Sequence, residues 1–275
     1  MDMTRQTPPR PVDVEQLFPE VVPLRKETVR LHPRAGAPTC RDSSVGGPLL
    51  WPAEEAWPQC PEHEEAPMVP VVQIYRSSVP DIVPFPDECD LLQVLWCPRK
   101  HSGYRWVVPH VQWREAGAVR NALAAPPSPA EVWKNYVPRP CVVHPEPVTE
   151  YPYWDLHDDM WDELEFRFLE VDEETGWDYQ SHLSTAPGTK LVGYPGWCQD
   201  PKWPDCSGCG NRMEHLLTVQ STEADALSRR AWVPTEDTHM PYEGPGLVLG
   251  DLGGVYLFEC RTCPGRPFTH RYDCP

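Results

Sequence analysis

Four cysteines in the C-terminal third of the chain have the spacing of a zinc site. Cys206 and Cys209 form one Cys-x-x-Cys pair, and Cys260 and Cys263 form another. Two intervening residues let the chain turn so that both sulfurs face one ion, and two such pairs complete a tetrahedron. These residues therefore predict a structural zinc site.

Other chemistry is open to the same cysteines. Two disulfides, a redox-active pair or an iron–sulfur cluster would use the same residue type. His270 and Cys274 lie close by in the sequence, and either could replace one of the four ligands.

A second set of ligands, of mixed type, lies earlier in the chain. Cys60 and His63 form a Cys-x-x-His pair, and Cys97 and His101 follow at a spacing of four. Cysteine and histidine are the usual ligands of zinc, so this set predicts a second zinc site. The alternative is a vestigial site that binds no metal, in which the four residues serve only as packing residues.

The two sets belong to a repeated framework. Gly47, Trp51, Trp57-Pro58 and Cys60 recur 146 residues later as Gly193, Trp197, Trp203-Pro204 and Cys206. An apolar run ending in Gln73 or Gln220 follows each copy, and a further apolar run leads into the second ligand pair. The pattern predicts a duplicated fold with one metal site in each copy.

Both predicted sites use four protein ligands, which favours a structural role, since catalytic zinc keeps a position for water or substrate. The sequence contains no Gly-x-Ser-x-Gly, Gly-x-Gly-x-x-Gly or His-Glu-x-x-His motif. No catalytic and no cofactor-binding residue is predicted beyond the metal ligands.

The expected fold class is α+β, with mixed or mostly antiparallel sheets, few short helices and internally duplicated halves stapled by zinc. Residues 1–43 are expected to be a Pro-rich lead-in that packs on the body. Residues 44–275 are expected to form a single domain. Its pseudo-repeats are 44–114 and 191–275, with an intervening segment at 115–190. Strands are expected at 69–75, 90–96, 105–113 and 216–220, a hairpin at 246–258, and helices at 115–125, 157–171 and 223–230.

Composition limits the classes of partner. The net charge of −17 disfavours nucleic acid and anionic membranes, because Lys and Arg supply most of the affinity for phosphate. No apolar stretch is long enough to cross a bilayer, and the N-terminus lacks the apolar core of a secretory signal. We therefore expect a cytoplasmic protein whose 11 cysteines are reduced.

Several segments together resemble the YwqG-like family of bacterial proteins of unknown function. In the first half they are Gly46-Gly-Pro-Leu-Leu-Trp-Pro52, Pro70-Val-Val-Gln-Ile74 and Asp90-Leu-Leu-Gln93; in the second they are Gly193-Tyr-Pro195, Leu216-Leu-Thr-Val-Gln-Ser221 and Gly250-Asp-Leu-Gly-Gly-Val-Tyr-Leu-Phe258. The resemblance covers roughly residues 44 to 260 and implies an α+β intracellular protein. The added Cys and His ligands are similar to a zinc-bearing, actinobacterial-type member. An association of some relatives with toxin systems implies an immunity or partner-binding role.

Three functions follow as expectations. The favoured one is a non-enzymatic module that binds a protein partner, such as a basic toxin, through its acidic surface. The alternative is a small-ligand binder or enzyme with a pocket between the two halves. Trp154, Trp161, Trp177, Tyr179 and the acids of 155–165 would line that pocket. The third is a redox or metal sensor that uses labile zinc thiolates.

Overall fold

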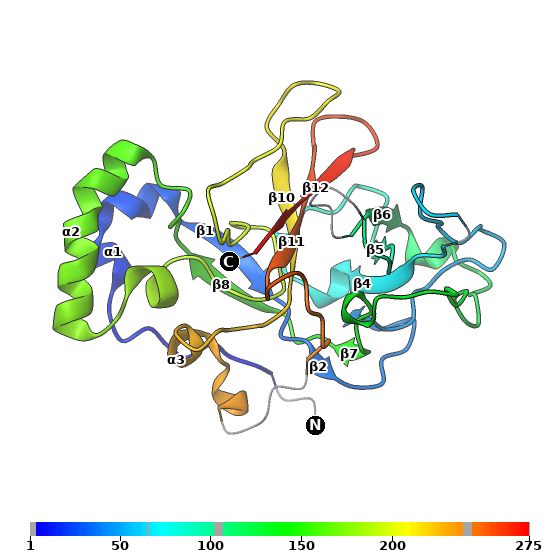
Figure 1. Ribbon diagram of the computed structural model, residues 1–275, viewed down its shortest axis with the longest axis horizontal. Coiled ribbons are helices and arrows are strands. Elements are labelled where there is room, and N and C mark those ends of the chain that lie inside the picture. The colour runs from blue at the N-terminus through cyan, green and yellow to red at the C-terminus, as the bar shows by residue number, and fades with distance from the viewer. Residues whose placement is uncertain (1–3, 65, 102–106, 239–243, 275) are drawn as a thin grey trace.

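The chain folds into two antiparallel sheets. The computed structural model describes residues 4–64, 66–101, 107–238 and 244–274, and within them each sheet has six strands (Figure 1). The first sheet has the order β12-β11-β10-β9-β1-β8, and the second has the order β2-β7-β3-β4-β5-β6. The expected α+β class with antiparallel sheets is confirmed.

The strands of the first sheet are β1 (Lys26–Arg30), β8 (Glu146–Glu150), β9 (Lys190–Leu191), β10 (Glu214–Gln220), β11 (Gly254–Glu259) and β12 (Phe268–Asp273). Those of the second are β2 (Arg34–Ala35), β3 (Ser44–Val45), β4 (Val69–Tyr75), β5 (Leu91–Trp96), β6 (Pro109–Arg114) and β7 (Cys141–Val142). The α-helices are α1 (Val14–Leu17), α2 (Asp158–Thr175) and α3 (Arg229–Trp232). Short 3₁₀ turns are η1 (Pro19–Leu24), η2 (Arg76–Ser78), η3 (Ala116–Ala118), η4 (Lys134–Tyr136) and η6 (Thr235–Asp237), and η5 (Tyr179–Leu183) is a π-turn. No helix among the described residues is long and apolar enough to cross a membrane.

The two sheets share one hydrophobic core. It joins Val29, Leu217 and Val255 of the first sheet to Val72 and Val94 of the second, all fully buried. Alternating residues of β5 and β11, namely Leu92, Val94 and Trp96 and then Val255 and Leu257, enter this core, as the period of two in a strand requires. A separate cluster under α2 covers the end of the first sheet, so the helices lie together at one side (Figure 1).

The two expected repeats have the same strand arrangement. Strands β4, β5 and β6 form a meander, and β10, β11 and β12 form another, with each pair antiparallel. Both first hairpins have a bulge near the start, between Pro70 and Val72 in one and between His215 and Leu217 in the other. The bulges make Thr218 the counterpart of Gln73. The sequence alignment of Gln73 with Gln220 is therefore out of register by two residues.

The lead-in contributes strands rather than only packing on the body. Strand β1 lies between β8 and β9 in the first sheet, and β2 pairs with β7 in the second. Strand β6 is an edge strand, as Pro109 predicts, because proline cannot donate a hydrogen bond to a further strand. The expectation for β6 began at residue 105, and residues 105 and 106 lie outside those described.

Three expected elements differ. The helix expected at 115–125 is only η3, because the N–H of Leu123 donates to Trp51 O (2.7 Å) and that of Ala53 donates to Asn121 O (2.9 Å). These tertiary bonds override the helical preference of an alanine-rich stretch. The helix expected at 223–230 is reduced to α3.

The hairpin expected at 246–258 supplies only β11. Both edges of β11 are occupied, by β10 and β12, so no edge remains for residues 246–249. That arm instead runs as an irregular segment. The N–H of Leu249 in it donates to the hydroxyl of Ser221 at 2.9 Å.

A buried ion pair crosses the first sheet. Lys190 Nζ donates to Glu150 Oε2 at 2.7 Å, and both side chains are almost fully buried. The same carboxylate accepts the backbone N–H groups of Ala186 (2.8 Å) and Tyr194 (2.5 Å). Glu150 thus connects β8 to the chain on either side of β9.

Replacing Glu150 with alanine should destabilise the protein by about 3–5 kcal/mol, because Lys190 would remain buried without a counter-charge. Chemical denaturation measures the change. Glu131, which is 77% exposed in its pair with Arg99, provides the control. Its replacement by alanine should change the free energy of unfolding by less than about 1 kcal/mol. Equal effects of the two substitutions would contradict a structural role for the buried pair.

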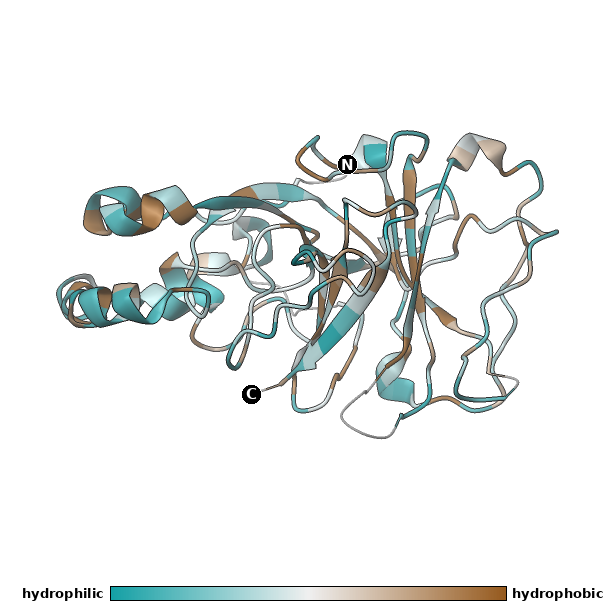
Figure 2. Cartoon of the chain, turned by 90° about the horizontal axis from the view of Figure 1, so that it is seen from above, coloured by the Kyte–Doolittle hydropathy of each residue, from teal (hydrophilic) through white to brown (hydrophobic). Residues whose placement is uncertain are grey.

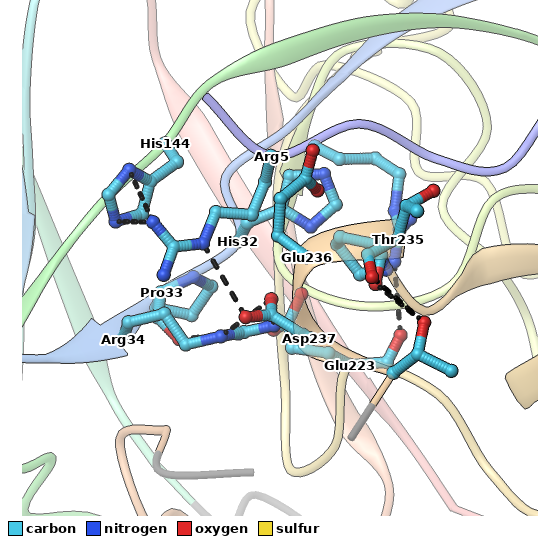
Figure 3. A network of polar contacts seen from close by, with 12 residues as sticks. Arg5, His32, Pro33, Arg34, His144, Glu223, Thr235, Glu236 and Asp237 are labelled. Atoms are coloured by element: carbon cyan, nitrogen blue, oxygen red, sulfur yellow. Dashed lines mark hydrogen bonds and ion pairs between the residues drawn. The ribbon is translucent and has the colours of Figure 1, made fainter. Parts of the chain in front are cut away.

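The N-terminal segment is tied to the body by polar contacts (Figure 3). Arg5 pairs with Asp237 at 3.6 Å, and the N–H of Thr235 donates to Gln6 O at 3.0 Å. Glu146 accepts the N–H of Thr7 at 2.7 Å. The start of the described chain is therefore held across both the β7–β8 region and η6.

His32 is a buried histidine in this network. Its Nε2 lies 2.8 Å from Glu146 Oε2. Burial lowers the pKa of His32 to about 4, although the hydrogen bond to Glu146 opposes this shift. The folded protein therefore keeps this imidazole neutral at pH values where the unfolded chain protonates it.

Stability should fall as the pH decreases from about 6.5 to about 4, because the unfolded state binds the proton at His32 first. The slope from this one group approaches about 1.4 kcal/mol per pH unit. His32→Gln should have a shallower pH dependence than the unsubstituted protein between about pH 5 and 6.5. Chemical denaturation of both proteins across that pH range measures the free energy of unfolding. The same pH dependence in both would show that His32 is not the group responsible.

Candidate metal centres and an adjacent cleft

The four C-terminal cysteines converge at one end of the β10–β11 hairpin. Their Sγ atoms all lie within 4.8 Å of one another. Cys206 Sγ is 3.8 Å from Cys263 Sγ, and Cys209 Sγ is 3.6 Å from Cys260 Sγ. Zinc–sulfur bonds of about 2.3 Å in a tetrahedron place sulfurs about 3.8 Å apart, so the spacing fits a zinc ion.

Disulfides do not fit these cysteines. A disulfide requires a sulfur–sulfur distance of about 2.05 Å, and all 11 cysteines are free. Neither His270 nor Cys274 belongs to the group. His270 lies within β12, opposite Leu257.

The turn between the first two cysteines favours the thiolate, which is the form that binds metal. The N–H of Gly208 points at Cys206 Sγ, 3.4 Å away. Backbone N–H groups of Cys209 and Gly208 lower the pKa of Cys206 to about 7.

The mixed group gathers in the same way beside the β4–β5 hairpin. Cys60 Sγ lies 3.6 Å from His63 Nδ1 and 3.3 Å from His101 Nε2, and His63 Nδ1 lies 3.4 Å from Cys97 Sγ. A tetrahedral zinc ion with sulfur and nitrogen ligands gives a separation of about 3.6 Å. The N–H of Glu62 points at Cys60 Sγ at 3.4 Å, which matches the turn at Cys206. All four predicted ligands are therefore brought together.

Matching backbone bonds hold the two groups. The N–H of Met68 donates to Pro58 O at 3.0 Å, and that of Met213 donates to Pro204 O at 2.9 Å. The second pair of ligands is anchored alike. The N–H groups of Cys97 and Cys260 donate across their hairpins to carbonyls of the next strand segment, at 3.0 and 2.9 Å. Cys97 and Cys260 thus each stand directly after the end of a paired strand.

Buried polar side chains fix the Gly-Pro-Trp loop of the first half. The N–H of Leu50 donates to Gln73 Oε1 at 2.8 Å, and Gln93 Nε2 donates to Leu50 O at 3.0 Å. Gln93 Nε2 also donates to Gln73 Oε1 at 2.8 Å. In the sequence Gln73 is recognisable only as the end of an apolar run, and its hydrogen bonds to this loop are visible only in the structure.

The second half achieves the same result with different residues. The hydroxyl of Thr218 donates to Pro195 O at 2.8 Å, and that of Tyr256 donates to Gly196 O at 2.8 Å. Gly196 stands 146 residues after Leu50, so the clamped loop is equivalent. In both halves buried side chains hydrogen-bond to the backbone of this loop, although the side chains differ. The two halves therefore share the loop conformation rather than the residues that hold it.

A tryptophan pair lies in the loop before each metal group. Trp51 and Trp57 have ring centroids 5.2 Å apart, and Trp197 and Trp203 have centroids 6.0 Å apart. Cys206, Cys260, Trp197 and Trp203 share one cluster. In the first half the tryptophans and the cysteine ligands belong to separate clusters. With four protein ligands each, the arrangement suits structural metal sites.

A cleft of about 1180 Å³ lies beside the C-terminal half. It is bordered by the start of β1, by residues 153–161 and by residues 192–215. Its side chains include Lys26, Tyr153, Trp154, Asp155, Trp161, Tyr194, Trp203, Arg212 and Glu214. The pocket expected between the two halves is thus found between the intervening segment and the second half. Trp177 and Tyr179 do not line this cleft.

The cleft contains charges of both signs. Trp203 Nε1 donates to Asp155 Oδ1, which joins two segments that line the cleft. Burial raises the pKa of Asp155, and the charges of Lys26 and Arg212 oppose this shift. Lys26 and Arg212 could not be predicted from the sequence, because they lie 186 residues apart and neither belongs to a motif.

Comparisons with known proteins give no family assignment. The chain matches no protein-family model, and a search of curated proteins finds no match.

Elemental analysis of protein purified under reductant should give two zinc ions per chain. Cys206→Ser combined with Cys260→Ser should leave one, and Cys60→Ser combined with Cys97→Ser should leave the other. Each double variant should lose several kcal/mol of stability, since metal binding is coupled to folding. A Cys89→Ser and Cys141→Ser control should keep both ions. One or no zinc in folded, unsubstituted protein would contradict one or both sites.

Proposed function

We propose that this protein is a non-enzymatic binding protein, stabilised by two structural zinc ions, whose helix α2 docks a basic protein partner. The observation that carries the proposal is the exposed surface of α2. Nine of its 18 residues are Asp or Glu, and only Arg167 is basic. Two apolar side chains project from the same surface: Phe166 is 72% exposed and Leu169 is 57% exposed.

The helix has a second, buried face that fixes its position. Leu164, Phe168 and Val171 are buried there. The ring of Phe168 stacks on Tyr179 at 4.0 Å and meets Phe18 edge-on at 5.1 Å. Because packing already holds α2, neither Phe166 nor Leu169 is needed for folding. The helix lies at one side of the molecule, away from the second sheet (Figure 1).

Charge and apolar contact have separate roles in such docking. The acids of α2, together with the net charge of −17, would accelerate the encounter with a basic surface. Phe166 and Leu169 would supply the desolvated contact that slows dissociation. Figure 2 shows mostly hydrophilic colour on the helices at this end, interrupted by hydrophobic patches.

Two further features support a binding protein rather than an enzyme. Both ligand groups would be filled by protein side chains, which leaves no open position for a reacting water. Metal-binding thiolates require reduced cysteines, which supports the further proposal of a cytoplasmic location. The resemblance to YwqG-like proteins supports the narrower proposal of an immunity protein that covers a basic toxin.

Phe166→Ser combined with Leu169→Ser should weaken partner binding by about tenfold or more, because a buried apolar anchor at an interface contributes on the order of 2 kcal/mol. Bait protein would first isolate the partner from extracts of the source cells. Calorimetry with the purified partner would then measure the dissociation constant. Leu227, which is 70% exposed outside α2, provides the control Leu227→Ser.

The association rate should also fall steeply with added salt, because exposed charges are screened. A partner that binds the double variant as tightly as the unsubstituted protein would refute docking on α2. So would a partner with an acidic surface and no salt dependence.

A further inference from the structure

One side of the cleft, formed by the intervening segment, is acidic. The other, formed by β1 and the second half, bears Lys26 and Arg212 and is called the basic side, although Asp200 and Glu214 also belong to it. Both sides are rich in aromatic rings. The intervening segment contributes Tyr153, Trp154, Asp155, Asp158 and Trp161; the start of β1 and the second half contribute Lys26, Tyr194, Trp203 and Arg212.

The basic side presents two cations that are stacked on rings. Lys26 Nζ lies 3.9 Å from the ring centroid of Tyr194 and 5.4 Å from that of Trp203. Arg212 Cζ lies 4.8 Å from the Trp203 ring. Within the part of the chain that the structure describes, neither cation forms an ion pair. Both cations are exposed at the cleft, where the rings hold them in place, and both interact electrostatically with Asp155 without forming a close ion pair.

The acidic side is centred on Asp155. One of its oxygens accepts the indole N–H of Trp203, and among the described residues it has no ion-pair partner. Burial raises the pKa of Asp155, and the nearby cations Lys26 and Arg212 only partly offset this shift. The charged form of Asp155 would therefore gain from a cationic group on a ligand.

We propose that this cleft binds a small zwitterion with an aromatic or apolar body, namely a free amino acid or a short peptide. Its carboxylate lies between Lys26 and Arg212, and its ammonium group faces Asp155. Its body packs on Trp154 and Trp161. Ligand pockets commonly measure about 300–1,000 Å³, so a cleft of about 1180 Å³ has room for either molecule.

The remaining charges favour a zwitterion over a simple anion. Asp158 and Glu214 also line the cleft and add negative potential. Glu214 Oε2 accepts the backbone N–H of Arg261 at 3.4 Å, and the guanidinium of Arg261 pairs with Glu259 at 2.9 Å. Arg261 is thus already partnered, and a ligand with only negative charge would be repelled by the acids.

Calorimetry with four probes tests the proposal. L-phenylalanine carries both charges and an aromatic body, and glycyl-L-phenylalanine places the charges further apart. 3-Phenylpropanoate lacks the ammonium group, and phenethylamine lacks the carboxylate. At least one zwitterion should bind saturably and about tenfold more tightly than either singly charged probe, since a charged hydrogen bond contributes on the order of 1.4 kcal/mol or more. The better zwitterion distinguishes an amino acid from a peptide as the ligand class.

Variants assign the two charges. Lys26→Gln combined with Arg212→Gln should weaken the zwitterion and 3-phenylpropanoate by about tenfold, and leave phenethylamine unchanged. Asp155→Asn keeps a hydrogen-bond acceptor for Trp203. It should weaken the binding of the zwitterion and of phenethylamine, and leave the binding of 3-phenylpropanoate unchanged. Lys100 stacks on Trp133 at 3.7 Å outside the cleft, so Lys100→Gln is a matched control that should change nothing.

Three outcomes would overturn the proposal: no saturable binding of any probe, 3-phenylpropanoate binding as tightly as the better zwitterion, or unchanged binding in all cleft variants. Circular dichroism should show native spectra for each variant, because the substituted side chains are not core residues. The test is independent of the proposed partner, since Phe166 and Leu169 of α2 do not line the cleft.

Discussion

Convergence of four ligand side chains at the end of a two-stranded hairpin is the constraint on which each half of this protein depends. An isolated hairpin is only marginally stable, and the chain, with 36 prolines, has short strands and long connections. Binding one ion at Cys206 and Cys260, or at Cys60 and Cys97, would join the loop before the first strand to the end of the second. The tryptophan pairs and clamped loops then have a fixed surface to pack on.

The two halves show which parts of a duplicated design tolerate change. Ligand positions, bulges and the backbone bonds around them match, whereas the loop clamp changed from Gln73 and Gln93 to Thr218 and Tyr256. Amide and hydroxyl groups can both satisfy a buried backbone carbonyl, so the position must be polar but its identity is free. The metal ligands are more restricted, because few side chains bind zinc.

The sequence was sufficient where a short-range pattern determines structure. Short apolar runs predicted β4 and β5, Pro109 predicted an edge strand, and ligand spacing predicted which side chains converge. It failed where long-range contacts decide the outcome. The 115–125 stretch is not a helix because its backbone bonds to the Trp51 loop, and residues 246–249 are not a strand because β11 has no free edge. The sequence also did not predict the position of the cleft, which was expected between the two halves. Lys26 and Arg212 come near each other only because strands far apart in the sequence pair in one sheet.

The two repeats and the intervening segment differ in how much of their surface is free for recognition. Each duplicated hairpin is closed by four ligands, two tryptophans and a shared core, so little of its surface can adapt to a partner. The intervening segment has no counterpart in the repeat, and it carries both α2 and the acidic side of the cleft. The same segment also carries β7, β8 and the buried Glu150–Lys190 pair, so only its exposed positions can vary without loss of the fold. Recognition is therefore best sought at the exposed side chains of residues 153–175 and in the β1 and Trp203 regions that border the same cleft.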